Sequence, residues 1–200
     1  MAIDPLKTVL LVIDMQSDFY ADGGNAALRG KPVEQMQALP AKIDAFATKL
    51  RAGGAKIVFT KFIYDPTRTP QNYSDIVGEI KNSNWMCRAN TPGAELSEVH
   101  PAKDDAVIEK FSYDCFAGTD LLQRCKEWGT DTIIIAGVRT EICVTHTACR
   151  SFAEGFRTII MSDLVGTYDN KREMAAAVLD ALRYSCYVMS SADAEQALVG

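Results

Sequence analysis

The chain has 200 residues, 48% of them hydrophobic and 24% charged, which are the proportions of an ordinary globular protein with one continuous core. The net charge is −5 and the 21 Lys and Arg residues form no long basic run, so nucleic acid is not expected as a partner. No apolar run reaches the length of a membrane span, and Asp4 and Pro5 stand where a signal peptide needs basic and then apolar residues. We therefore expect a cytoplasmic protein with no membrane partner, whose six cysteines stay reduced.

Short β-branched segments alternate with segments of helical spacing along the whole chain. The predicted strands are Thr8–Ile13, Lys56–Ile63, Ala106–Glu109, Ile133–Gly137, Thr158–Met161 and Tyr187–Met189. The predicted helices are Ala41–Arg51, a helix capped by Thr119 and Asp120, a helix from Thr140 to Glu154, Asn170–Tyr184, and a last one after Ser191. This alternation predicts one α/β domain over residues 1–200, with a doubly wound parallel sheet of about six strands and helices on both faces.

Two charged residues stand directly at the carboxyl ends of predicted strands, where open α/β sheets bind ligands. Asp14 follows the first strand, although a carboxylate that caps a turn would explain this segment equally well. Lys110 follows the third strand among aromatic residues, and a surface lysine is the commoner reading of such a position. The stretch between the second and third strands, residues 67–101, is long and irregular, which is typical of a binding loop or lid.

Cys143 follows the apolar run that starts at Ile133 and ends at Gly137, and it falls in the first turn of the predicted helix, with Thr140 suited to the N-cap position. Free backbone N–H groups and the helix dipole at such a place favour the thiolate, which is the nucleophilic form. The alternative is a cysteine that packs as a small apolar residue. His146 lies one turn further along, where we expect it to pack or point away rather than act as a base.

Asp14, Lys110 and Cys143 would share one crevice at the carboxyl edge of the sheet. A lysine ammonium would fix the carboxylate and lower the pKa of the thiol, and the carboxylate could take the thiol proton and return it to a leaving amine. Phosphate-binding glycine motifs are missing from the sequence, which also has only two histidines, so no cofactor and no metal are expected.

Three segments together resemble the isochorismatase-like cysteine hydrolases, which include nicotinamidases, N-carbamoylsarcosine amidases, and ureidoacrylate and biuret amidohydrolases. They are LLVIDMQSDF at Leu10–Phe19, IEKFSYDCFAGTDL at Ile108–Leu121 and IIIAGVRTEICVTHTACRSFAEGF at Ile133–Phe156. The resemblance covers nearly the whole chain and implies a catalytic triad of Asp14, Lys110 and Cys143. It also implies a cis peptide bond before Arg139, an oxyanion hole made by the backbone N–H groups of Arg139 and Cys143, and a homodimer or homotetramer.

Two features depart from the family pattern. Nicotinamidases that bind a metal carry an aspartate and histidines after the second strand, whereas this chain reads TKFIYDP at Thr60–Pro66, so neither a metal nor nicotinamide as substrate is expected. Arg139 stands where the family usually has a small residue. Its guanidinium would either bind a substrate carboxylate or ureido oxygen, or pair with an acid such as Glu141.

The leading hypothesis is a hydrolase that cleaves a C–N bond of a small linear amide, carbamoyl or ureido compound through a thioester-type intermediate. Candidate pocket walls are Phe19, Trp85, Phe111, Tyr113 and Phe116, with a plain anchoring role the more common use of such a tryptophan. One alternative is a vinyl-ether hydrolase of the isochorismatase type, which needs an acid but no thiol. The other is a binding member of the fold without catalysis, which would not be expected to keep all three triad residues.

Overall fold

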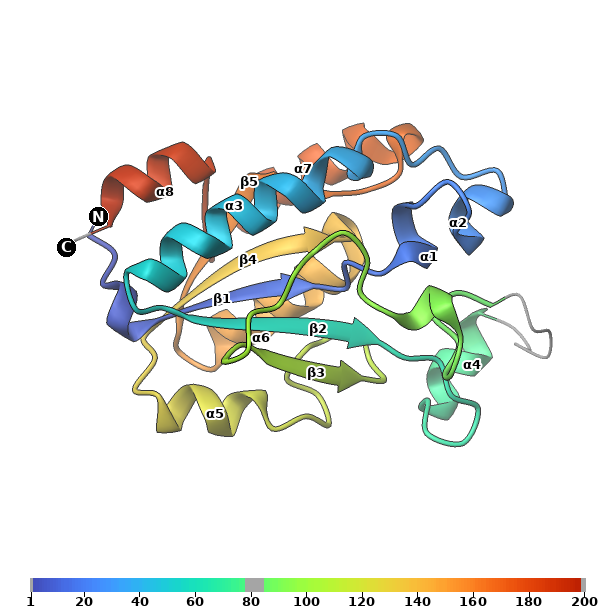
Figure 1. Ribbon diagram of the computed structural model, residues 1–200, viewed down its shortest axis with the longest axis horizontal. Helices are drawn as coiled ribbons and strands as arrows, with labels where there is room; N and C mark the ends of the chain where they lie inside the picture. Colours follow the sequence, from blue (N-terminus) through green and yellow to red (C-terminus); the bar gives the residue numbers. More distant parts are fainter. Residues whose placement is uncertain (1, 78–84, 199–200) are drawn as a thin grey trace.

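The computed structural model describes residues 2–77 and 85–198, and its centre is a six-stranded parallel sheet in the order β3-β2-β1-β4-β5-β6 (Figure 1). The strands are β1 (Thr8–Ile13), β2 (Lys56–Phe62), β3 (Ala106–Lys110), β4 (Thr132–Val138), β5 (Arg157–Gly166) and β6 (Tyr187–Met189). Every pair of neighbouring strands is parallel. The predicted α/β class and the parallel sheet are confirmed.

The two central strands, β1 and β4, are buried along their whole lengths. Both are runs of β-branched and aliphatic residues, which is the composition that a strand covered on both faces requires. The chain winds outward from β1 through β2 to β3 and then from β4 through β5 to β6. The order therefore reverses between β1 and β4, and ligands of doubly wound sheets bind at the carboxyl side of such a point.

Helices cover both faces of the sheet. The longer ones are α3 (Leu39–Ala52), α5 (Leu121–Glu127), α6 (Thr145–Ala153), α7 (Arg172–Leu182) and α8 (Ser191–Ala197). Successive side chains of a strand point to opposite faces, so β1 contributes Leu10 and Val12 to the core under α3 and α8. It contributes Val9, Leu11 and Ile13 to the second core, under α5, α6 and α7. None of the described helices is long and apolar enough to cross a bilayer.

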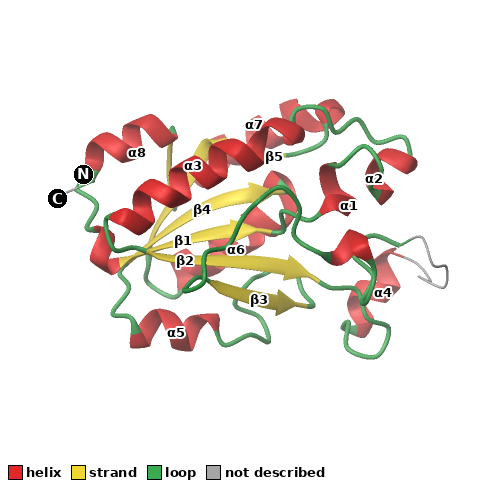
Figure 2. Cartoon of the chain, in the orientation of Figure 1, coloured by secondary structure: helices red, strands yellow, loops and turns green. Residues whose placement is uncertain are grey.

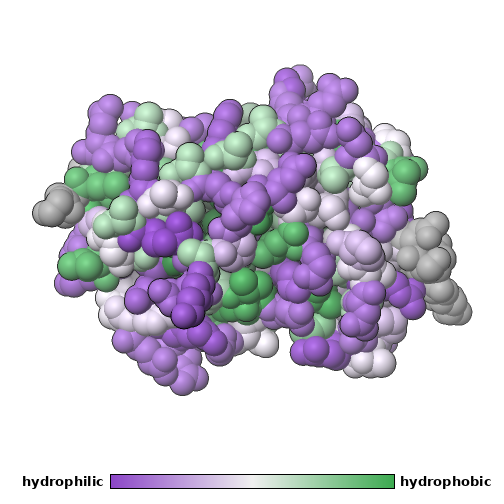
Figure 3. All heavy atoms as spheres, viewed as in Figure 1, coloured by the Kyte–Doolittle hydropathy of each residue, from purple (hydrophilic) through white to green (hydrophobic). Residues whose placement is uncertain are grey.

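The strands all end toward the side of the molecule that carries α1 (Ser17–Tyr20), α2 (Asn25–Leu28) and α4 (Gln71–Val77), and both chain termini lie at the opposite end (Figure 2). In the space-filling view, hydrophilic residues cover most of the face that is turned toward the viewer in Figure 1, and apolar ones show between them near its middle (Figure 3). The short helices at the carboxyl edge thus stand over the edge where Asp14 and Lys110 emerge.

Local expectations differ from the structure in three places. β5 continues to Gly166, because the pairing of β4 with β5 shifts register after Ile135 and then resumes. Short helices form in two stretches where no helix was predicted: α2 lies before the first predicted helix, and α4 and a 3-10 turn at Pro92–Ala94 lie within 67–101. Residues 78–84 of that stretch lie outside the described part of the chain.

Candidate active site

A buried ion pair joins the ends of β1 and β3. Lys110 Nζ lies 2.8 Å from Asp14 Oδ2, and neither side chain has any solvent exposure. The second carboxylate oxygen, Oδ1, accepts a hydrogen bond of 2.7 Å from Thr60 Oγ1 on β2. The ammonium also donates to the backbone carbonyls of Ser112 at 3.0 Å and Tyr113 at 3.3 Å. A buried pair needs such additional hydrogen bonds because both ions have lost their water.

The ammonium form of Lys110 is stabilised by its partner. Burial is the largest single influence and lowers the pKa of Lys110, but the negative charge of Asp14, the hydrogen bond to it and the charges of Cys143 and Cys115 together hold the pKa above its usual value. Lys110 is therefore positively charged at neutral pH, and Asp14 is its counter-ion. The pair fixes a charged carboxylate in a place where water cannot solvate it.

Cys143 stands beside this ion pair, in a π-helical turn at Thr140–Val144 that directly follows β4. Burial raises the pKa of the Cys143 thiol well above its usual value, and the charge of Lys110 opposes this rise. The charge of Asp14 and a hydrogen bond to Asp14 raise the pKa further. The resting side chain is thus a neutral thiol that faces a carboxylate. The expectation that the helix start and Lys110 would favour the thiolate is wrong for the resting state, because burial and Asp14 outweigh them.

The turn that carries Cys143 also differs from the expected α-helical start. Arg139, not Thr140, is the N-cap residue, no side chain caps this turn, and the carbonyl of Thr140 instead accepts a hydrogen bond from Thr145 Oγ1. π-Helical turns widen a helix by one residue and occur often at functional sites. The peptide bond between Val138 and Arg139 is cis.

Gly137 lets β4 approach β1 at the point where both strands end. Its φ is +107°, and a Cβ atom there would lie 2.1 Å from the carbonyl oxygen of Ile13. Only glycine can take this conformation at this distance from another backbone. The close approach brings the segment before Cys143 next to the residue that precedes Asp14.

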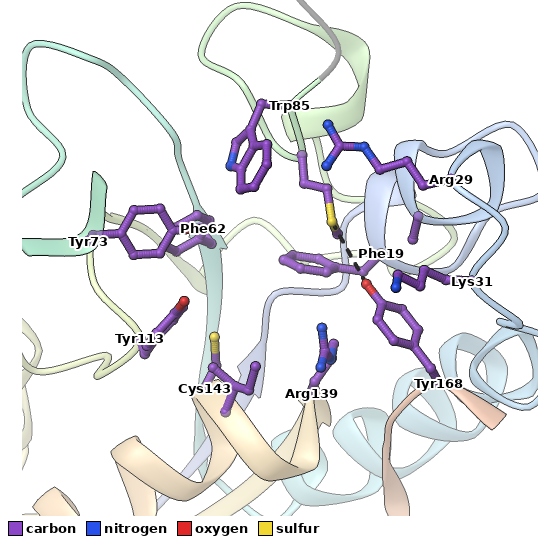
Figure 4. Close-up of a pocket in the computed structure, with 13 residues that line it drawn as sticks. Phe19, Arg29, Lys31, Phe62, Tyr73, Trp85, Tyr113, Arg139, Cys143 and Tyr168 are labelled. Atoms are coloured by element: carbon purple, nitrogen blue, oxygen red, sulfur yellow. Dashed lines mark hydrogen bonds between the residues drawn. The ribbon is translucent and has the colours of Figure 1, made fainter. Parts of the chain in front are cut away.

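A cavity of about 220 Å³ opens above the thiol (Figure 4). Of the residues predicted from sequence to line a site, Phe19, Trp85, Tyr113, Arg139 and Cys143 do so. The cavity also has aromatic walls that sequence reasoning missed, namely Phe62, Tyr73 and Tyr168, and it has two further cations, Arg29 and Lys31. No local pattern marks these residues, because they come from four segments that only the fold brings together.

Two predicted wall residues lie outside this cavity. Phe116 is 5% exposed in the core below the sheet, and its ring stacks on Phe156 with centroids 6.2 Å apart. Phe111 lines a neighbouring hollow and lies under the guanidinium of Arg68, 3.9 Å from its ring centroid. Both follow β3 and stand on either side of Tyr113, which does line the cavity. His146 lines the same neighbouring hollow, and its Nδ1 contacts the carbonyl of Ile142 at 2.8 Å.

Arg139 pairs with Glu141, the acid considered for it, and also faces the cavity. Its guanidinium pairs with Glu141, with 3.1 Å between Nε and Oε1, and lies 4.1 Å above the ring of Tyr168. The same side chain lines the cavity beside Cys143. Its position is therefore fixed from two sides, and most of its charge is already compensated by an acid.

Asp18, which sequence reasoning did not single out, ties two loops to the cavity. Its carboxylate is buried and accepts hydrogen bonds from the backbone N–H groups of Asn25 at 3.0 Å and Cys87 at 2.7 Å. The Asn25 side chain bonds both Asp18, at 3.0 Å, and the carbonyl of Trp85, at 3.3 Å. A signal for this role was its place one turn after the strand-end acid Asp14.

Residues suited to a metal are not gathered at this site. Within the ranges 2–77 and 85–198, no three His, Cys, Asp or Glu side chains are close enough together to hold a metal ion. After β2, Asp65 turns outward and accepts hydrogen bonds from Thr67 at 2.8 Å. The donor set thus does not fit the metal of the family's metal-binding members.

The sequence and the fold of this chain are similar to those of several known proteins. The family model for the isochorismatase domain matches residues 8–193. The isochorismatase of Bacillus subtilis is 28% identical over 196 residues, which is 96% of this chain and 59% of that protein. The ureidoacrylate amidohydrolase RutB of Serratia proteamaculans is 23% identical over 180 residues, or 81% of this chain and 71% of that protein.

Among solved structures, a cysteine hydrolase from Pseudomonas syringae pv. phaseolicola superposes with a TM-score of 0.86 at 23% identity. The superposition covers 98% of this chain and 94% of the other, so the two share the whole fold. The family model, which spans nearly the complete sequence, establishes that the chain belongs to the isochorismatase family.

Proposed function

We propose that the protein hydrolyses a C–N bond of a small amide, carbamoyl or ureido compound, with Cys143 as nucleophile. One observation carries the proposal: a thiol at the floor of a cavity lies beside a fully buried carboxylate–ammonium pair, Asp14 and Lys110. A buried acceptor next to a neutral thiol is the arrangement that nucleophilic catalysis needs. The named activity of the ureidoacrylate amidohydrolase among its relatives supports this class of substrate.

In the first half of the reaction, Cys143 Sγ attacks the substrate carbonyl carbon while its proton passes to Asp14. The carbonyl oxygen becomes an oxyanion, which the backbone N–H groups of Arg139 and Cys143 stabilise. The tetrahedral intermediate then collapses: the C–N bond breaks, the proton on Asp14 moves to the leaving nitrogen, and an amine or ammonia departs. An acyl or carbamoyl thioester remains on Cys143.

In the second half, water attacks the thioester carbon and gives a proton to Asp14. The C–S bond breaks, the proton returns to sulfur, and the acid product leaves. Lys110 keeps its proton throughout and holds Asp14 in place, as its raised pKa requires. In each half of the reaction Asp14 thus acts first as a base and then as an acid. The positive charge of Lys110 favours the return of Asp14 to the carboxylate form.

Vinyl-ether hydrolysis, the reaction class of an isochorismatase, is the second candidate, because the relative from Bacillus subtilis bears that name. That reaction begins with protonation of a carbon by an acid and does not use a thiol. Here the carboxylate is the counter-ion of a buried ammonium and faces a thiol, which suits a base better than an acid.

The test is ammonia release from biuret, ureidoacrylate, N-carbamoyl amino acids, maleamate and nicotinamide, with isochorismate assayed beside them and chelator present. Wild type would be compared with Cys143→Ala and with Cys149→Ala, which removes an exposed cysteine six residues further along. We expect release by wild type and Cys149→Ala but none by Cys143→Ala, and a covalent adduct on Cys143 in quenched samples. Full turnover by Cys143→Ala would overturn the thiol mechanism.

A further inference from the structure

The charged residues that line the cavity all have the same sign. Arg29, Lys31 and Arg139 are present in the lining, and no Asp or Glu is among the described lining residues. The chain as a whole carries a net charge of −5, so this local excess of positive charge runs against the composition. Cations that gather at a cavity in an acidic protein attract an anion to it.

The three cations are not equivalent. Arg139 lies on the same side of the cavity as Cys143, where it is paired with Glu141. Arg29 and Lys31 reach toward the cavity from the loop that follows α2, on the far side from Cys143 (Figure 4). The Arg29 guanidinium lies 4.7 Å from the ring centroid of Trp85, an aromatic face that holds the cation in place.

We infer that the substrate is an anion whose carboxylate binds Arg29 and Lys31 while its amide or ureido carbonyl reaches Cys143. The inference rests on the proposed function, because it states where each end of the substrate that Cys143 would cleave lies in the cavity. The aromatic walls between the two ends, Phe19 and Tyr168, offer apolar contact to the linking atoms but no charge. The loop that carries Arg29 and Lys31 therefore selects the substrate by its charge, while the triad performs the chemistry.

Iodoacetate and iodoacetamide test this selection without a known substrate, because both alkylate a thiol and they differ in one negative charge. The measured quantity is the rate ratio of iodoacetate to iodoacetamide at Cys143, divided by the same ratio at the exposed Cys149 in the same sample. Peptide mass spectrometry reads both sites at once. Cys149 thereby corrects for the intrinsic reactivity of each reagent.

We expect this normalised ratio to fall roughly fivefold in Arg29→Met/Lys31→Met, the effect of one good ion pair at a partly exposed site. The matched control, Lys42→Met/Lys103→Met, removes two exposed cations away from the cavity and should leave the ratio unchanged. High salt should lower the wild-type ratio, because exposed charges are screened.

Two results would overturn the inference separately from the proposed function. An unchanged ratio in the Arg29/Lys31 double variant, with Cys143 still reactive, would show that the loop does not select for charge, and the thiol mechanism would stand. An equal fall in the control variant would assign the effect to net charge alone. If Cys143 reacts with neither reagent, the nucleophile itself is lost and both proposals fail together.

Discussion

Replacing Lys110 by methionine tests the buried ion pair most directly. Methionine keeps most of the length of the side chain but removes the charge, and it leaves the buried Asp14 carboxylate without a cationic partner. Breaking a buried pair by removing one partner costs about 3–5 kcal/mol. This is a large part of the roughly 5–15 kcal/mol that stabilises a typical domain, so Lys110→Met should fold but unfold at a much lower urea concentration.

The double variant Asp14→Asn/Lys110→Met distinguishes pairing from simple loss of packing. With both charges removed, no ion remains buried, and Thr60 can still donate to the side chain at position 14. We expect the double variant to lose less stability than the sum of the two single variants, by about 1–3 kcal/mol. All three variants should lack hydrolase activity, so recovery of stability would come without recovery of function.

Urea unfolding followed by both circular dichroism and tryptophan fluorescence gives these free energies, provided that the two signals coincide. Arg124→Met is the control, because Arg124 and Asp120 form an ion pair whose side chains are 41% and 51% exposed. That pair should contribute less than about 1 kcal/mol. If Lys110→Met costs no more than Arg124→Met, or if the two single costs simply add, the pair does not stabilise the site as argued.

Two further predictions concern the thiol and the glycine beside it. Since Asp14 raises the pKa of Cys143 and Lys110 lowers it, the pH midpoint of Cys143 alkylation by iodoacetamide should move down in Asp14→Asn and up in Lys110→Met; a shift in the same direction for both variants would contradict this assignment. Gly137→Ala should lower the free energy of unfolding by more than about 2 kcal/mol, because its Cβ meets a backbone carbonyl of β1. Gly155→Ala, where φ is +89° but the space is open, should cost only about 1 kcal/mol, and equal losses at the two sites would refute the steric argument.

The strands and their carboxyl ends could be predicted because both are written in short stretches of sequence. A buried parallel strand needs five or six consecutive apolar residues, and the first polar residue after it marks the edge of the sheet. Asp14 follows this rule, whereas Lys110 ends a shorter strand in which the charged Glu109 already precedes it, and the structure brings Asp14 and Lys110 to 2.8 Å of each other. Composition alone does not give the length of a strand whose end depends on pairing with its neighbour, as in β5, which continues past a shift in register.

The cavity walls could not be predicted in the same way, because they depend on contacts between distant segments. Trp85 reaches the cavity through a loop that Asp18 holds by a hydrogen bond to Cys87, 69 residues away in the chain. Phe116 follows a strand end just as Phe19 does, yet it turns into the core, because α5 and α6 leave an apolar space there. An aromatic residue near a strand end can thus lie either in the cavity wall or in the core, and the packing of remote helices decides which.

The protonation state of Cys143 likewise could not be predicted from the local sequence, because it depends on groups that the fold brings together. Its place at the start of a helical turn favours a thiolate by a local argument, and so does the nearby Lys110. The fold adds full burial and a carboxylate that is itself the counter-ion of Lys110, and these reverse the sign of the pKa shift. One ammonium cannot fully compensate two anions that are both buried beside it, which is why the pKa of the thiol rises. In the proposed mechanism the sulfur therefore gains its negative charge as Asp14 takes the proton during the attack, rather than before it.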